Sequence, residues 1–146
     1  MYHHFEFFLV SIGMDDGCVR LHNIQSERPL ITWQGTIDEL PIKKIVWSPS
    51  RPCVFVILDV KSRIHLWDLG SGDIYPAHTV ELKSGTNDFS MNTQSDHYQE
   101  QQRQILALAS DEGIINIHML SPEYLSGDEV SCKKELARFL HYVSII

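Results

Sequence analysis

Cysteine is scarce in this 146-residue sequence, and its distribution excludes several chemistries. Cys18, Cys53 and Cys132 are odd in number, widely spaced and form no Cys-x-x-Cys pair. Such spacing predicts no zinc site, and a free cysteine inside an apolar strand behaves as a small hydrophobic residue. We therefore expect reduced thiols in a cytosolic protein, without a disulfide framework.

Long apolar runs and basic clusters are also missing. No stretch approaches the roughly 18–20 consecutive apolar residues of a membrane span. The first ten residues have neither the basic region nor the cleavage site of a signal peptide. The formal net charge is −7, and no run of Lys or Arg exceeds two, whereas a nucleic-acid footprint needs a clustered basic face. We expect neither a membrane span nor nucleic-acid binding.

Catalytic motifs are absent despite the presence of eight histidines. There is no His-Glu-x-x-His sequence, no Gly-x-Ser-x-Gly elbow and no phosphate loop. The acidic pairs at 15–16 and 111–112 lie in turns, where Asp serves backbone geometry. We expect no enzyme activity, no metal and no cofactor. A cluster of His22, His65 and His118 with a carboxylate would contradict this expectation.

What the sequence does contain is one pattern that occurs three times. Each copy is an apolar strand, a tight polar turn and a second apolar strand ending near His or Trp, at 7–23, 54–68 and 105–119. The turn residues Gly17, Ser62 and Gly113 align, at a period of about 45–51 residues that is typical of propeller blades. The middle copy ends in Leu-Trp-Asp, which contains the Trp-Asp dipeptide of the WD repeat.

The repeat predicts an all-β fold. We expect a partial WD40 β-propeller, with about two and a half to three blades of antiparallel four-stranded sheets, followed by an amphipathic C-terminal helix. The blades are placed at 1–36, where the innermost strand is lacking, at 37–83, which is complete, and at 84–121, and the helical tail at 122–146. Because closed propellers have about 4–8 blades, the chain is expected to be a piece of a longer protein. This piece is itself expected to self-associate through its open sheet edges.

Two segments of this pattern differ from the rest. The run from Val54 to Leu58 is continuously apolar, which predicts a strand buried on both faces. Residues 83–103 are mostly polar, with an insertion near 93–103. We interpret most of this segment as a mobile loop, with 89–91 as a short inner strand of the last blade.

Several residues are assigned to the structure of the repeat. His22 and His118 stand where a Trp is usual and are expected to be packed and hydrogen-bonded, and Trp67 is expected to wedge against a neighbouring blade. Trp33 lies on an outer strand and is either a core residue or an exposed anchor for a partner. The residues assigned to the repeat are Asp16, Gly17, His22, Trp47, Pro49, Trp67, Asp68, Gly113 and His118.

The tail changes to a helical period. Ser126 and Glu129 match a capping box, and apolar residues then recur every three to four positions. The resulting stripe requires a cover, which is either the rim of the propeller or a partner. The candidate partner-binding residues are therefore Trp33, Leu136, Phe139 and Leu140.

The middle blade resembles a known family. The run Trp-Ser-Pro-Ser-Arg-Pro-Cys-Val-Phe at 47–55, the segment 64–69 and the ending at 114–120 followed by a helix are similar to the dynein intermediate chains, a WD-repeat family. The greatest similarity is to intermediate chains of the dynein that drives retrograde intraflagellar transport in cilia, and it covers most of residues 7–143. His22-Asn23 and His118-Met119 depart from the pattern, since they replace Trp-Asp.

The resemblance implies a non-catalytic subunit whose propeller binds the tail of the dynein heavy chain. It also implies other dynein subunits as partners, and locations in the cytoplasm, the cytoskeleton and the cilium. The family's light-chain-binding region lies upstream of the propeller and has no counterpart here. The alternative is a generic WD-repeat scaffold that binds peptides or other proteins outside the dynein system.

Overall fold

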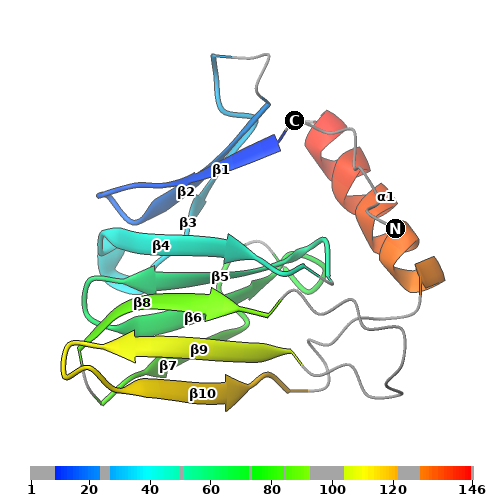
Figure 1. The fold of residues 1–146 in the computed structure, drawn as a ribbon. Helices are drawn as coiled ribbons and strands as arrows, with labels where there is room; N and C mark the ends of the chain where they lie inside the picture. Colours follow the sequence, from blue (N-terminus) through cyan, green and yellow to red (C-terminus); the bar gives the residue numbers. More distant parts are fainter. Residues whose placement is uncertain are drawn as a thin grey trace.

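The computed structural model describes residues 9–23, 27–49, 51–72, 74–83, 85–92, 104–121 and 129–145. Within these ranges, ten strands form three antiparallel sheets, and a single long helix follows them (Figure 1). We refer to these as the first, middle and last sheets. Their strands are β1 (Leu9–Gly13), β2 (Cys18–Asn23), β3 (Ile31–Gln34), β4 (Ile42–Trp47), β5 (Val54–Asp59), β6 (Arg63–Asp68), β7 (His78–Glu81), β8 (Thr86–Met91), β9 (Ile105–Ser110) and β10 (Ile115–Met119).

Each sheet is a meander, in which consecutive strands are neighbours. The strand orders are β1-β2-β3, β4-β5-β6-β7 and β10-β9-β8. The first strand of each sheet contacts the first strand of the next one, since β4 contacts both β1 and β8. The middle sheet has four strands, whereas three are described in each of the others. The blade boundaries at 36, 83 and 121 stay predictions.

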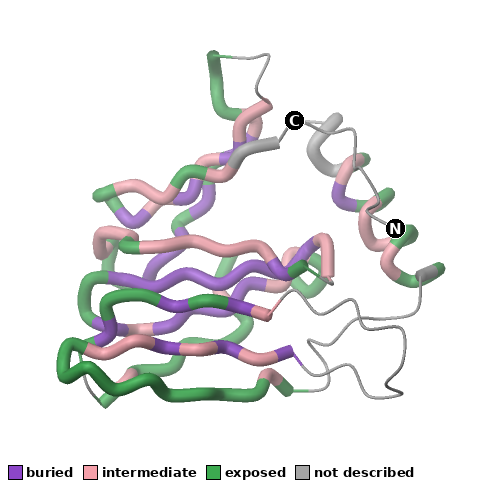
Figure 2. The backbone as a smooth tube through the Cα atoms, viewed as in Figure 1, coloured by how far each residue is buried: buried purple, intermediate pink, exposed green. Residues whose placement is uncertain are grey.

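The middle sheet lies between the other two, which explains its composition. One face of β5 and β6 packs into a cluster with β8 and β9, and the other face packs into a cluster with β2 and β3. Val54, Val56 and Leu58 belong to the first cluster, whereas Phe55 and Ile57 belong to the second, as the two-residue alternation of a strand requires. All six residues of β5 are buried (Figure 2), so the prediction of a strand buried on both faces is confirmed.

The interpretation of 83–103 as mostly loop was wrong for its first part. A full strand, β8, runs from Thr86 to Met91, and residues 93–103 lie outside the described part of the chain. A bulge between Thr86 and Asp88 shifts the register with β9, so Thr86 and Phe89 are both buried although three positions separate them. This spacing breaks the alternation by which strands are recognised in a sequence.

A short 3-10 turn and a helix complete the fold. The turn η1 (Ile37–Glu39) connects the first and middle sheets, and Arg63 of β6 donates hydrogen bonds to Ile37 O and to Asp38 Oδ2. The helix α1 (Glu129–Ile145) confirms the predicted helical tail, although residues 126–128 of the expected capping box lie outside the described ranges. Among the helices of the described ranges, none is long and apolar enough to cross a bilayer.

Candidate protein-interaction surfaces

The three aligned turns have the same backbone conformation. Gly17 and Gly113 both have φ of 77°, and Ser62 has φ of 61°. At Gly17 the preceding Asp16 supports the turn, because its Oδ1 accepts a hydrogen bond from the amide of Cys18 at 2.9 Å. This bond is the main reason why the pKa of Asp16 lies below its ordinary value. These residues shape turns, and the left-handed conformation explains the two glycines.

The most polar cluster in the core surrounds Asp59, at the end of β5. Its Oδ1 accepts hydrogen bonds from the amides of Lys61 and Arg63, at 2.9 and 3.0 Å. Its Oδ2 accepts one from Arg63 Nε at 2.8 Å and lies 2.9 Å from His65 Nε2. The other ring nitrogen of His65 lies 3.1 Å from Thr79 Oγ1, on β7. The network therefore connects β5, β6 and β7.

Burial and hydrogen bonding have opposite effects on Asp59. Burial alone would raise its pKa, but the bonds from His65 and Arg63 outweigh burial, so the pKa of this carboxyl lies below its ordinary value. Both Asp59 and His65 are fully buried. With a hydrogen on Nε2, His65 donates to Asp59 and can accept the Thr79 hydroxyl at Nδ1, so both ring nitrogens have a partner. The sequence reasoning missed this network, although Asp59 and Arg63 flank a hairpin and His65 follows on the same face.

The histidines do not form a catalytic cluster. His22 lies on β2, His65 on β6 and His118 on β10, which belong to three different sheets. Of these three, His65 lies beside a carboxylate, that of Asp59. His22 is half-buried, but His118 is exposed, so its prediction as a packed residue was wrong. Over the described residues, no group of three or more His, Cys, Asp or Glu side chains is placed to hold a metal ion.

Aromatic rings join the first and middle sheets. Trp67 is fully buried, stacks on Phe55 at 5.8 Å between ring centroids, and donates its indole N–H to Gly35 O at 3.0 Å. Trp67 is therefore held against the connection that leaves the first sheet, which confirms its predicted place against a neighbour. Trp47 lies on the other side of Phe55, at 4.8 Å, and its indole N–H donates to Ser11 Oγ.

Trp33 belongs to this core and does not form a surface anchor. Only 4% of it is exposed, and its ring lies 6.1 Å from that of Phe55. The possibility of an exposed anchor was therefore wrong, because the alternation of β3 directs Trp33 inward beside Ile31. Its indole nitrogen has no hydrogen-bond partner within the described part of the chain.

Side chains of the loop between β4 and β5 bind the helix to the middle sheet. Pro49 in this loop is exposed, and Arg51 donates two hydrogen bonds to Glu135 of α1. Asp68 of the Trp-Asp dipeptide lies 3.6 Å from Arg51 Nη2 and accepts a hydrogen bond from the amide of Gly70. The bond to Glu135 is the main cause that raises the pKa of Arg51.

The apolar stripe of the helix is covered mainly by the chain itself. Phe139 is buried in the cluster of the first and middle sheets, 6.2 Å from the ring of Trp47. Leu136 and Leu140 are half-buried beside it. Cys53 Sγ lies 3.7 Å from Glu135 O, and burial raises the pKa of this thiol to about 12. The stripe was predicted to be covered either by the rim of the propeller or by a partner. Phe139 packs on the rim and is therefore not accessible to a partner.

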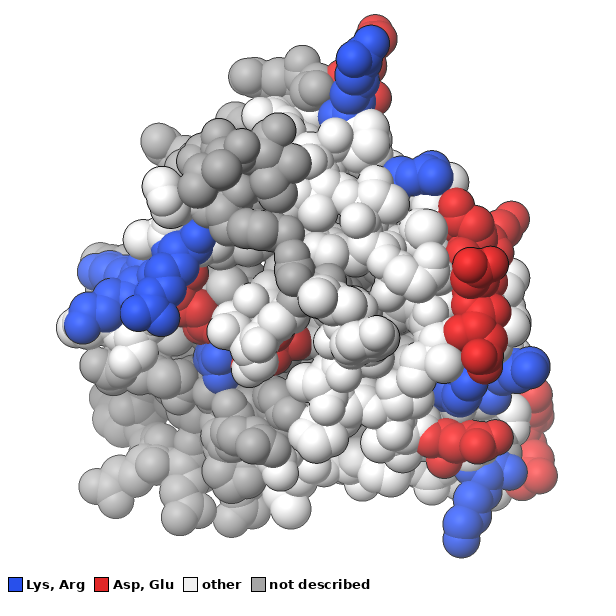
Figure 3. Space-filling view, turned by 180° about the vertical axis from the view of Figure 1, so that it is seen from behind, with Lys and Arg blue, Asp and Glu red and all other residues white. Residues whose placement is uncertain are grey.

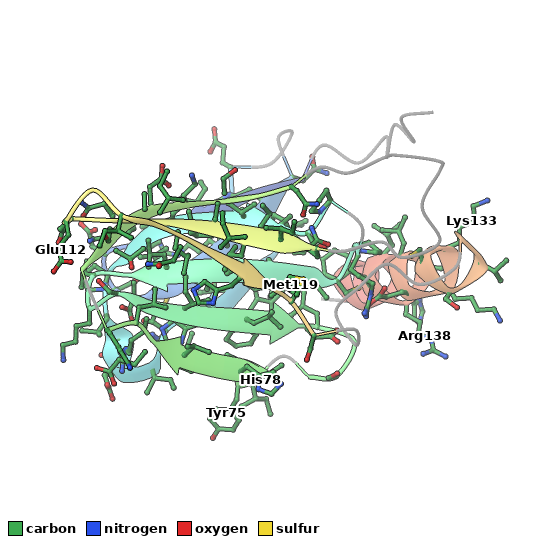
Figure 4. All side chains as sticks on the ribbon, turned by 60° about the horizontal axis from the view of Figure 1, so that its bottom comes forward. Tyr75, His78, Glu112, Met119, Lys133 and Arg138 are labelled. Carbon is green, nitrogen blue, oxygen red and sulfur yellow. The ribbon has the colours of Figure 1, made fainter. Side chains whose placement is uncertain are left out.

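The described residues leave several surfaces accessible to other proteins, and two of them concern the helix and the last sheet. The outer side of α1 carries basic residues, and Figure 4 shows Lys133 and Arg138 directed away from the sheets. In Figure 3 one group of basic atoms lies at the left edge of the molecule, whereas at the right edge a band of acidic atoms has further basic atoms beside it. On the last sheet, the five residues of β10 are all exposed (Figure 2).

The three stacked meanders and the aligned turns define a partial WD40 β-propeller with a C-terminal helix, as predicted. Sqt1 of Saccharomyces cerevisiae matches with a TM-score of 0.59 at 15% identity, over 80% of this chain and 29% of that chain. A chain of the mitotic checkpoint complex matches with a TM-score of 0.53 at 16% identity, over 78% and 33% of the two chains. These likenesses concern the fold alone.

The sequence is similar to dynein intermediate chains. It is 40% identical over 72 residues to cytoplasmic dynein 2 intermediate chain 1 of Mus musculus, which is 49% of this chain and 7% of the relative. It is 41% identical over 64 residues, 44% and 6% of the two chains, to the protein of the same name in Homo sapiens. The chain matches no protein-family profile. The predicted resemblance is confirmed, and it supports a role in protein interaction.

Proposed function

We propose that this chain is a non-catalytic scaffold of the dynein system, in which it binds the tail of the motor heavy chain. The observation that carries this proposal is the 40% identity to a dynein 2 intermediate chain, in a chain that has the propeller fold. Retrograde intraflagellar transport is the proposed process. Other dynein subunits are the proposed further partners, and the cytoplasm, cytoskeleton and cilium are the proposed locations.

The chemistry of the described residues supports a scaffold more than an enzyme. The histidine–carboxylate pair, His65 and Asp59, is fully buried, and protein groups satisfy its hydrogen bonds. An active site needs reactive groups at a cleft where a substrate can reach them. Binding of another protein needs only an accessible surface, which α1 and β10 provide.

The outer side of α1 is the part of the helix that a heavy-chain segment can reach. Phe139 and Glu135 hold the inner side against the sheets, while Lys134 and Arg138 are exposed. Positive side chains on a chain of net charge −7 favour a partner segment that is acidic, because complementary charges steer association. We therefore propose an acidic segment of the heavy-chain tail as the bound element.

Co-precipitation with a dynein 2 heavy-chain tail tests the proposal. The tagged full chain is expected to retain the tail at low salt and to lose part of it at high salt. The paired substitution Lys134→Glu and Arg138→Glu is expected to weaken retention. A matched control, Lys61→Glu and Lys83→Glu, changes the same charge at exposed sites of the middle sheet and is expected to retain the tail.

Three outcomes would contradict the proposal in different ways. Absence of the tail from the wild-type precipitate would contradict heavy-chain binding. Equal weakening by both pairs would indicate a general charge effect and would contradict the assignment to α1. Recovery of unrelated proteins without any dynein subunit would favour the generic WD-repeat scaffold. Circular dichroism on each variant separates loss of binding from loss of fold.

A further inference from the structure

β10 is an edge strand with which no other described strand pairs on its outer side. Exposed edges in natural sheets are usually shortened, bulged or charged, which prevents pairing with another chain. The other edges of the described sheets follow that rule, except β1, which has no charge and no bulge but lies in contact with β4 of the middle sheet. β4 and β8 have bulges and carry Lys43, Lys44 and Asp88, while β3 and β7 have four residues each, and β7 ends in Glu81. β10 has five residues, no charge and a regular register with β9.

The middle sheet shows what normally occupies this position. Aligned on the turn residues Ser62 and Gly113, β10 corresponds to β6, and β6 pairs with a fourth strand, β7. No described strand pairs with the corresponding edge of β10. The side chains that match the buried Ile64 and Leu66 are Ile115 and Ile117, which are 69% and 62% exposed.

We propose that β10 pairs with β10 of a second copy of this chain, antiparallel, with Ile117 on the two-fold axis. Ile115 then lies opposite Met119, and Asn116 lies opposite His118. Directly opposed residues share one face of a sheet, so the three apolar side chains of each copy form one continuous apolar face. The contact is isologous and closes at two copies.

The hydrogen-bonding groups of the β10 backbone point in the directions that this pairing needs. Ser110 donates to Ile114 O, and Leu120 donates to Gln104 O, so the even-numbered residues face β9. In an antiparallel ladder the alternate residues direct their N–H and C=O groups to the other side. Ile115, Ile117 and Met119 therefore present these groups to the open edge. A register centred on Ile117 matches donors with acceptors across the two copies.

The template pair β6–β7 also supports a second copy as the occupant. In that pair, Val80 lies opposite Ile64, and Thr79 lies opposite His65. In the proposed dimer the corresponding positions are filled by Met119 and His118, which again give an apolar residue and a hydrogen-bonding residue. The absence of charge on β10 means that identical strands meet without repulsion. This inference is independent of heavy-chain binding.

Sedimentation equilibrium of the full chain over a range of concentrations tests the dimer. The wild type is expected to shift from monomer to dimer as concentration rises. Ile117→Lys puts two like charges beside the two-fold axis and is expected to abolish the dimer. Val80→Lys is the matched control, since Val80 is also exposed and apolar on an outer strand, and the dimer is expected to persist. Unchanged circular dichroism and melting are required of both variants.

Cross-linking keeps the test valid if Ile117→Lys fails to fold. With Cys18 and Cys132 replaced by Ser, Ile117→Cys is expected to give covalent dimer with a short bis-maleimide, and Val80→Cys is expected to give much less. A monomer at every concentration, open-ended assembly instead of a dimer, loss of the dimer in Val80→Lys alone, or equal cross-linking of the two cysteine variants would each overturn the proposal.

Discussion

Arg51 holds Glu135 through two hydrogen bonds, from Nε to Oε2 at 2.9 Å and from Nη2 to Oε1 at 2.6 Å. The two residues are 84 positions apart, in the loop after β4 and in α1. Their side chains are only 16% and 15% exposed. Two parallel bonds between a guanidinium and a carboxylate are stronger and more directional than one. The position of the helix on the rim therefore depends on this pair together with Phe139.

Arg51→Ala is expected to loosen the helix. Loss of the charged partner leaves Glu135 partly buried without its main bonds, which predicts a loss of about 1–3 kcal/mol in the free energy of unfolding. Hydrogen exchange in α1 is expected to accelerate more than exchange in β5. Arg20→Ala is the matched control, because its 3.4 Å pair with Asp16 is more exposed and is expected to contribute less than about 1 kcal/mol. Equal effects of the two substitutions would contradict the assignment.

Asp59→Asn is expected to remove a pH-dependent part of the stability. The pKa of Asp59 in the fold lies below its ordinary value of 3.8, so the folded protein favours the ionised form. That contribution is fully present above the unfolded pKa and is lost as pH falls through the lowered folded value. Urea unfolding of wild type and variant at pH 7 and at pH values near 3–4 is expected to show a difference that shrinks on acidification. A constant difference would contradict this account.

The repeated pattern made the sheets predictable from the sequence. The alignment of Gly17, Ser62 and Gly113 located three hairpins, and all three residues have positive φ. The apolar run in β5 predicted burial on both faces, because alternation disappears where a sheet lies between two others. Local signals of turn and period were sufficient for these features.

The remaining features depend on non-local contacts. Only residues 89–91 of β8 were predicted as a strand, because the bulge near Thr86 breaks the alternation at its start. The burial of Trp33 was left open because it depends on the neighbouring sheet. The pairing of Arg51 with Glu135 could not be predicted from the sequence, because no local pattern indicates which acidic residue of the helix lies beside Arg51. Similarly, the exposure of His118 follows from the position of β10 at an open edge.

Trp67→Phe and Trp33→Phe are expected to differ although the substitution is the same. Trp67 loses the hydrogen bond to Gly35 O and leaves that acceptor in the core, whereas Trp33 loses an indole N–H that has no described partner. Trp67→Phe is therefore expected to lower the free energy of unfolding by about 1–3 kcal/mol more than Trp33→Phe does. Guanidinium denaturation measures both values. Equal losses would indicate that ring volume alone determines the result.

Gly17→Ala and Gly113→Ala are expected to separate backbone strain from crowding. Both glycines have φ of 77°, so alanine imposes the same left-handed strain of roughly 1–2 kcal/mol at each site. A Cβ at Gly113 would meet nothing within 4 Å, whereas a Cβ at Gly17 would lie 2.9 Å from the Gln34 amide nitrogen and against Thr36. Gly17→Ala is therefore expected to cost more, and differential scanning calorimetry of the two variants gives the comparison. A larger loss at Gly113 would show that the turn after β1 can relax, and that its close packing against the connection to the middle sheet is not required for the fold.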